Sequence, residues 1–162
     1  MSVVAEEQIE SQNAVVQWVT FSLGAEHFGV PVMQVQEVLR VTEIAPVPGA
    51  PGHVLGIINL RGKVVSVIDG RARFGLMPEE LTDASRIVII EVKGQVAGLL
   101  VDSVAEVANL RASDVEPPPK VAADDTANYI QGVANRSEHG LLILVDLNRL
   151  LSTDEWSALQ TD

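Results

Sequence analysis

The sequence contains an internal repeat, and this repeat limits the folds that are open to the chain. Residues 18–41 align without a gap to residues 87–110, and the same residue types recur at matching places. The matched pairs are Gly29 with Gly98, Val30 with Leu99, Val32 with Val101, Val35 with Val104, Glu37 with Glu106, Val38 with Val107 and, further along, Pro48 with Pro117. After a small insertion the matches go on as Gly56 with Gly132, Asn59 with Asn135 and Asp69 with Asp146. Equivalent glycines and apolar runs in the same order indicate a duplicated unit.

Each unit is expected to consist of short β-strands. Residues 19–23 alternate between apolar and polar side chains, as in a half-buried strand, and residues 28–32 return after a turn as the second strand of a hairpin. The other elements expected in the first unit are a short helical turn at 33–35, strands at 36–41, 53–60 and 63–69, a Pro/Gly loop at 45–52 and a polar connector at 77–86.

A unit of this kind has about five strands in roughly 65 to 70 residues, which is too few to bury much core alone. The sequence therefore predicts a mainly β protein in which two five-stranded barrels pack on each other around a groove. We expect a mobile arm at 1–15, a first lobe at about 16–85 and a second lobe at about 86–152, with exchange of strands between the lobes left open. We expect residues 153–162 to form a helical tail, which a capping signal at Ser152, Thr153 and Asp154 introduces.

Charge and composition exclude several classes of function. The formal net charge is −11, whereas nucleic acids and anionic membranes require clusters of Lys and Arg. The chain has no cysteine, which excludes disulfides, thiolate catalysis and Cys-based zinc sites and fits a reducing compartment. It has no apolar run of about 18 residues and no signal peptide pattern at its start. We expect a cytoplasmic protein.

No motif in the chain indicates catalysis. His27, His53 and His139 are scattered over expected loops and form no HExxH motif. A GxSxG elbow is missing, and the glycine-rich stretches lack the order of a phosphate-binding loop. Paired carboxylates such as Glu79–Glu80 and Asp124–Asp125 lie in polar connectors. We expect no enzymatic activity, no metal and no cofactor.

The turn between the strands at 53–60 and 63–69 carries an unusual set of residues. Gly56 and Gly62 permit close backbone approach and a positive φ angle, and Asn59 can hydrogen-bond the neighbouring backbone. Arg61 lies among apolar strands, and strand logic makes Glu37 its nearest partner. Such a pair can be structural, or it can be presented to a protein partner, since Arg is favoured at interface hot spots. The residues alone leave both interpretations open.

Residues 16–152 resemble the CheW family, the adaptors of bacterial chemotaxis arrays. The motif residues that carry this resemblance are Leu23, Gly24, Glu26, Phe28, Gly29, Val35, Glu37, Pro48, Pro51, Val54, Gly56, Asn59, Arg61, Gly62 and Asp69. In the second half, the stretches "VAGLLVDSVAEV", "EPPP", "YIQGVAN" and "LLILVDLNRLL" match as well.

The resemblance implies two five-stranded SH3-like β-barrel lobes and no catalysis. A CheW-like protein couples methyl-accepting chemoreceptors to the histidine kinase CheA. It binds the helical tip of the receptor in a groove between its lobes, and it docks barrel to barrel with the regulatory domain of the kinase. The implied location is the cytoplasm, with recruitment to membrane-associated receptor arrays.

The resemblance also implies site residues. Those for the receptor in the first lobe are Val32, Val35, Glu37, Val38 and Arg61, and the repeat adds Leu99, Val101 and Val104 from the second lobe. Those for kinase docking are Gly56, Asn59 and Gly62, with Gly56 in the docking loop. A helix in a groove would need apolar anchors with a polar rim around them. The alternative for each valine is that it belongs to ordinary barrel core.

Departures from the family pattern leave the cognate partners open. Gly70 replaces the usual Leu, the N-terminal arm is long, and residues 135–140 form a charged loop where the first unit has Asn59–Gly62. An adaptor of a paralogous chemosensory array, such as one that controls type IV pili or development, is the first alternative. A small-ligand-binding β-barrel protein is a distant alternative. A detached regulatory lobe of a kinase is a neighbour of the adaptor hypothesis, and it is disfavoured because no ATPase or phosphotransfer segment fits in 162 residues.

Overall fold

The structure is a computed structural model that describes residues 14–50, 52–118, 129–136 and 139–159. The strands are β1 (Val15–Leu23), β2 (Glu26–Pro31), β3 (Val35–Arg40), β4 (Val54–Leu60), β5 (Lys63–Asp69), β6 (Arg86–Val92), β7 (Gln95–Val101), β8 (Ser103–Arg111), β9 (Val115–Glu116), β10 (Ile130–Asn135) and β11 (Leu141–Val145). The helical elements are the 3₁₀ turns η1 (Val32–Gln34) and η2 (Ala112–Asp114) and the short α-helices α2 (Gly70–Arg73), α3 (Leu147–Leu150) and α4 (Thr153–Ala158). The prediction of a mainly β chain with short C-terminal helices is confirmed. Most of the expected mobile arm and the last three residues lie outside the described residues.

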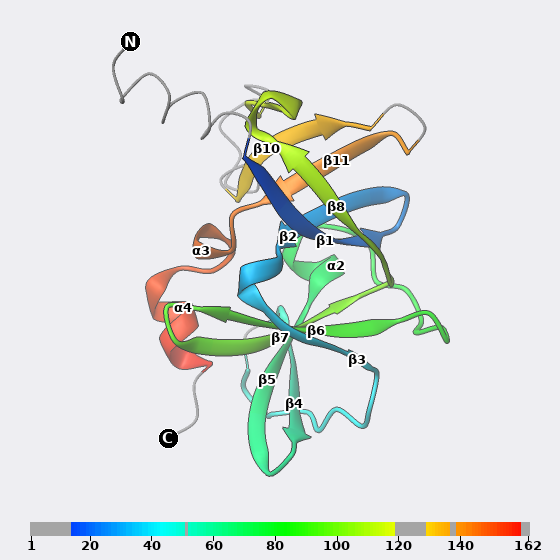
Figure 1. Cartoon of the computed structure of the whole chain (residues 1–162). Helices are drawn as coiled ribbons and strands as arrows, with labels where there is room; N and C mark the ends of the chain where they lie inside the picture. The colour runs from blue at the N-terminus through cyan, green and yellow to red at the C-terminus, as the bar shows by residue number, and fades with distance from the viewer. Residues whose placement is uncertain (1–13, 51, 119–128, 137–138, 160–162) are drawn as a thin grey trace.

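The strands form two sheets, which lie one above the other in Figure 1. The first sheet has the order β8-β1-β2-β11-β10-β9, and the second has the order β3-β6-β7-β5-β4. The extra strand of the first sheet, β9, is only two residues long. In each sheet one pair of neighbours is parallel, β2 with β11 in the first and β5 with β7 in the second.

The two repeat units exchange strands. The first sheet combines β1 and β2 of the first unit with β8, β10 and β11 of the second, and the second sheet combines β6 and β7 with β3, β4 and β5. The repeat pairs β1 with β6, β2 with β7 and β3 with β8, so the two sheets have the same internal order. Neither sheet is therefore built from one half of the sequence alone.

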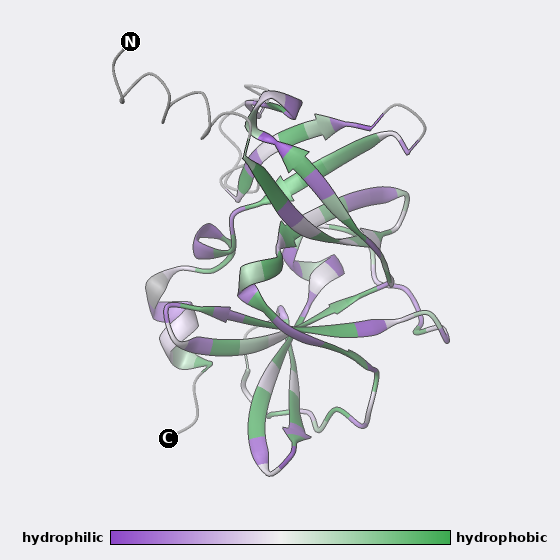
Figure 2. Cartoon of the chain, viewed as in Figure 1, coloured by the Kyte–Doolittle hydropathy of each residue, from purple (hydrophilic) through white to green (hydrophobic). Residues whose placement is uncertain are grey.

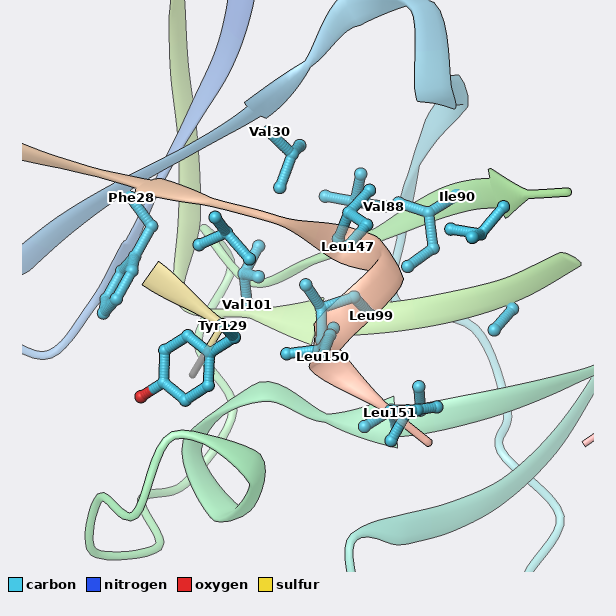
Figure 3. Packing of buried hydrophobic residues seen from close by; sticks show 14 of the residues in the cluster. Phe28, Val30, Val88, Ile90, Leu99, Val101, Tyr129, Leu147, Leu150 and Leu151 are labelled. Atoms are coloured by element: carbon cyan, nitrogen blue, oxygen red, sulfur yellow. The ribbon is translucent and has the colours of Figure 1, made fainter. Parts of the chain in front are cut away.

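The part of the chain that the structure describes contains three clusters of buried apolar side chains. Each sheet has a small cluster of its own, centred on Trp18 and Leu144 in the first and on Ile87 and Ile58 in the second. The largest cluster, here called the shared core, takes side chains from both sheets and from α3, as Figure 3 shows. Its labelled members in Figure 3 are Phe28, Val30, Val88, Ile90, Leu99, Val101, Tyr129, Leu147, Leu150 and Leu151. The shared core supplies the burial that a single unit lacks.

Strand β6 contributes side chains to two of the clusters. Its apolar run Ile87–Ile90 is buried on both faces, with Ile87 and Ile89 in the cluster of the second sheet and Val88 and Ile90 in the shared core. Successive side chains of a strand point to opposite faces, so a continuous apolar run is the pattern of a strand covered on both sides. The edge strands β3 and β8 contain more hydrophilic residues than β6, and Figure 2 shows hydrophilic residues in purple.

Aspartates that match in the repeat begin two short helices. The Asp69 side chain accepts a hydrogen bond from the backbone N–H of Arg71 at the start of α2, at 3.1 Å. Asp146 does the same for Asn148 in α3, at 3.0 Å. The sequence analysis did not predict α2. Its capping residue, Asp69, is nevertheless the repeat equivalent of Asp146, which caps α3. At α4, Ser152 and Glu155 form a capping box, which confirms the capping signal.

Each sheet curls until its two edges meet along a seam. In the second sheet Ala45, which follows the edge strand β3, pairs with Ile57 of the other edge strand, β4, through two backbone hydrogen bonds of 2.8 and 2.9 Å. In the first sheet β9, which follows β8, pairs with β10. A glycine lies at each seam: a Cβ on Gly56 would collide with the carbonyl oxygen of Ala45, and one on Gly132 would lie 2.6 Å from Cγ1 of Val115.

Candidate functional site

Three of the predicted receptor-binding valines lie at the margin of the shared core. Val32 in η1, Val35 in β3 and Val104 in β8 are half-buried and pack against that core from its edge. The turn η1 connects β2 of the first sheet to β3 of the second and lies against β1 and β6 (Figure 1). Val38, on β3, is more exposed, at 39%. Val32, Val35 and Val104 therefore have both an anchored side and an accessible side.

Leu99 and Val101 do not face a groove, and this part of the prediction is wrong. Their exposed fractions are 0% and 1%, and both belong to the shared core (Figure 3). Strand alternation does direct them toward the other sheet, but the space between the sheets is filled by packed side chains. A partner cannot touch either residue without opening the core.

Arg61 and Glu37 form the expected ion pair. The Nη1 atom of Arg61 donates to Oε1 of Glu37 at 3.1 Å, and its Nη2 atom donates to Oε2, so the contact is bidentate. The hydrogen bond from Arg61 lowers the pKa of Glu37 below its ordinary value, and the same bond raises the pKa of Arg61. The side chain of Arg61 is still 71% exposed. Its guanidinium is therefore held in one orientation while remaining open to a partner.

A tight turn positions Arg61. Leu60 and Lys63 pair across the hairpin, and the two residues between them, Arg61 and Gly62, have φ angles of +51° and +86°. Positive φ at both positions is the signature of a type I′ turn. Asn59 stabilises the turn because its Oδ1 atom accepts a hydrogen bond from the N–H of Gly62 at 2.8 Å, which confirms the expected local role of Asn59.

The Glu37–Arg61 pair spans the seam of the second sheet, because Glu37 is on β3 and Arg61 is at the tip of the β4–β5 hairpin. The first sheet has a counterpart that the sequence alignment of the units did not reveal. Arg136, after β10, contacts Glu106, the repeat partner of Glu37, at 3.5 Å. Arg136 directly follows Asn135, whereas Arg61 is two positions after the matching Asn59, so only the equivalence of Glu106 and Glu37 could have indicated the pair.

The three residues predicted for kinase docking fall into two groups. Asn59 and Gly62 are exposed at the hairpin tip, whereas Gly56 is buried within β4 rather than in a loop. Gly56 has no side chain with which to contact a partner. It can affect a docking surface only because it allows another segment of the backbone to approach closely. Beside the hairpin is a depression of about 490 Å³, lined by Thr42, Glu43, Ala45, Ile57, Ile58, Asn59 and Val64.

A second ion pair, between Arg71 and Asp102, was not expected from the sequence. Arg71 of α2 donates from Nε and Nη2 to the Asp102 carboxylate at 2.9 and 2.5 Å and from Nη1 to the carbonyl of Met77 at 2.9 Å. Asp102 also accepts from the N–H of Gly24 at 2.7 Å. Only 14% of the Arg71 side chain is exposed. Asp102 therefore joins α2 and the end of β7 to the β1–β2 turn, and its bond to Gly24 connects the two sheets.

We expect Arg71→Ala to lower Tm by roughly 5 °C, because it removes three hydrogen bonds and leaves the Asp102 carboxylate without its cation. The bond from Arg71 lowers the pKa of Asp102 below its ordinary value of 3.8. A lowered native pKa stabilises the fold above pH 3.8 and loses that effect as the pH falls below this value. Thermal unfolding from pH 7 to pH 3 should therefore show a smaller acid-induced fall in Tm for Arg71→Ala than for the wild type.

Arg149→Ala is the matched control, since Arg149 pairs with Asp146 at 3.5 Å with 68% of its side chain exposed. A surface pair of this kind contributes little to stability. Equal Tm values for the two variants would contradict a structural role for Arg71.

The described residues contain no group of three or more His, Asp or Glu side chains that could hold a metal ion. Among the same residues, no helix is long and apolar enough to span a membrane. His53 lies 3.4 Å from Glu155 and joins the loop before β4 to α4.

Comparisons with known proteins identify the relatives of the chain. A family model described as the CheW-like domain matches residues 17–155. "Chemotaxis protein CheW" of Rhizobium meliloti is 36% identical over 140 residues, covering 86% of this chain and 90% of the relative. The protein of the same name from Treponema pallidum is 35% identical and covers 88% and 86% of the two chains. The crystal structure of the scaffolding protein TtCheW from Thermoanaerobacter tengcongensis superposes with a TM-score of 0.78 at 37% identity, over 88% of this chain and 96% of that one.

Proposed function

The chain belongs to the CheW-like family, and we propose that it is a non-enzymatic adaptor that couples chemoreceptors to a CheA-type histidine kinase. At the coarser level it is a CheW-family scaffold protein of chemotaxis. The proposed partners are the cytoplasmic tip of a methyl-accepting receptor and the regulatory domain of the kinase. The proposed location is the cytoplasm, at receptor arrays on the membrane.

The observation that carries the proposal is the pre-oriented and exposed guanidinium of Arg61. Its bidentate bond to Glu37 fixes its direction, and its 71% exposure leaves donor atoms for a partner. The accessible sides of Val32, Val35 and Val104 supply apolar contacts. Oriented charge with apolar anchors suits a helical hairpin, which presents apolar side chains at helical spacing between polar ones.

The exposed tip of the β4–β5 hairpin suits the second partner. Asn59 and Gly62 lie at the tip, and the neighbouring depression has Ile57 and Ile58 in its lining. A barrel of the kinase regulatory domain would bury apolar surface there. Two modest contacts are enough for such an adaptor, because an array multiplies weak interactions.

The alternative is the same adaptor chemistry in a paralogous chemosensory array. "Protein FrzA" of Myxococcus xanthus is 30% identical over 141 residues and covers 82% of this chain, so a relative with another name has almost the same level of identity. A deletion strain tests which of the two arrays the protein serves. A defect in swimming assays would favour the chemotaxis array, and a defect in surface-motility assays would favour the paralogous one.

We expect Arg61→Ala to keep the fold and to weaken capture of a partner about tenfold, the size of effect that a hot-spot residue has. The purified protein would be titrated against a soluble receptor hairpin fragment and against the kinase regulatory domain from the same organism, with kinase activation as the functional readout. The partner whose affinity falls identifies the surface that Arg61 serves.

Lys63→Ala is the matched control, because it removes one positive charge from the same hairpin without touching Glu37. Equal losses of partner affinity in Arg61→Ala and Lys63→Ala would show that the effect comes from net charge alone. An Arg61→Ala protein that no longer folds would assign the pair a purely structural role. If the wild type binds neither partner, the adaptor proposal fails.

A further inference from the structure

Met33 is the most exposed large apolar side chain among the described residues, at 95%. It lies in η1, between Val32 and Gln34, in the turn whose valine packs against the shared core. Methionine is among the residues that folded proteins bury most often. The turn is therefore held in place by its neighbour while the Met33 side chain projects into solvent.

The internal repeat shows that the fold does not need an apolar side chain at this position. The residue equivalent to Met33 in the second unit is Asp102, because Val32 aligns with Val101. There the same place after the second strand of the unit holds a carboxylate that binds Arg71 and the N–H of Gly24. The position thus accepts a fully polar group, and the thioether of Met33 is free to serve a partner.

Sulfur chemistry in this chain is restricted to methionine. The sequence has no cysteine and three methionines, Met1, Met33 and Met77. Met77, in the loop after α2, is 80% exposed. An exposed thioether reacts with a two-electron oxidant such as a peroxide: one oxygen atom is transferred to sulfur, the O–O bond breaks, the sulfur loses two electrons and water is released. The product is methionine sulfoxide.

We propose that Met33 is an oxidation site at which a peroxide switches off receptor docking. The inference rests on the proposed function, since it places Met33 beside the receptor-binding valines. In the reduced state the flexible, polarisable side chain adapts to an apolar partner surface. The sulfoxide places a strong hydrogen-bond acceptor in that contact, where no water reaches it, and an unsatisfied acceptor weakens binding about tenfold. The fold is unaffected because the side chain is in solvent.

The test compares receptor affinity before and after oxidation. The full-length protein is treated with hydrogen peroxide, peptide mass spectrometry measures the 16 Da gain at each methionine, and titration with the receptor hairpin fragment gives Kd. Met33→Leu removes the proposed site, and Met77→Leu removes the other exposed thioether. The wild type and Met77→Leu should each lose about tenfold in affinity on oxidation, whereas Met33→Leu should keep its own starting affinity. A methionine sulfoxide reductase should restore the oxidised wild type.

Three results would overturn the inference. One is an unchanged Kd for wild-type protein whose Met33 is fully oxidised, and another is an equal loss of affinity in oxidised Met33→Leu. The third is loss of the folded-state circular dichroism spectrum in the oxidised wild type, because the lower affinity would then come from unfolding and not from a docking effect. If the reduced wild type does not bind the fragment at all, the proposed receptor docking itself fails. Retained binding to the kinase regulatory domain would then limit that failure to the receptor surface.

Discussion

Replacing Gly56 with alanine is expected to lower the free energy of unfolding by about 3 kcal/mol and to abolish capture of the kinase regulatory domain. The added Cβ would collide with the carbonyl oxygen of Ala45 and lie 3.0 Å from Cα of Pro46. Both are backbone atoms, so no side-chain rotation relieves the contact. The two hydrogen bonds between Ala45 and Ile57 must then stretch, and the lining of the depression beside the hairpin moves with them.

Gly75→Ala is the control for the backbone alone. Gly75 has a positive φ of +76°, like many glycines in turns, but a Cβ there meets nothing within 4 Å. It should therefore show only the cost of a left-handed backbone, about 1 kcal/mol. Gly132→Ala, at the seam of the first sheet, should resemble Gly56→Ala in stability while keeping kinase capture. Urea unfolding curves give the free energy of unfolding of all three variants. Equal values for Gly56→Ala and Gly75→Ala would show that the seam can open without loss of stability.

Leu99→Ala is expected to destabilise the protein by about 2 to 5 kcal/mol, the range for truncating a fully buried leucine. Leu99 is 0% exposed and lies in the shared core between the sheets. The cavity would be surrounded by both sheets and by α3, so the loss should appear as one cooperative shift of the urea midpoint. Receptor affinity, measured well below that midpoint, should remain that of the wild type.

Leu141→Ala is the same chemical change at a residue that is 56% exposed, and it should alter stability by less than about 1 kcal/mol. A Leu99→Ala variant with normal stability and weakened receptor binding would show that Leu99 does belong to the receptor-binding site.

Most of the secondary structure could be predicted from the sequence because it depends on local patterns, and one ion pair could be predicted because few charged residues lie near it in the sequence. Alternating residues such as Val19, Phe21 and Leu23 predict a strand wherever they occur. The repeat predicts two similar units, and Glu37 was expected to pair with Arg61 because few charges lie among the neighbouring apolar strands. Ser152, Thr153 and Asp154 predict the start of α4 as a local capping signal.

The depth of each apolar residue could not be predicted in the same way. Alternation assigns Leu99 and Val104 to the side that faces the other sheet, but it does not reveal whether that side is packed or open. Burial depends on which strands cover the residue, and the strand exchange decides that through contacts between residues far apart in the sequence. The pairs Arg71–Asp102 and Glu106–Arg136 were missed for the same reason, since their partners lie 31 and 30 positions apart.

The exchange of strands also sets an order for folding during synthesis. The second sheet comes from one continuous stretch, β3 to β7, so all its strands are available once Val101 has left the ribosome. Strands β1 and β2 emerge earlier, yet their neighbours β8 and β11 are completed only at Arg111 and Val145. The first strands to be made are thus the last to obtain all their partners. Until then the nascent chain carries the apolar side chains of β1 and β2 on open strand edges, where other chains can pair with them.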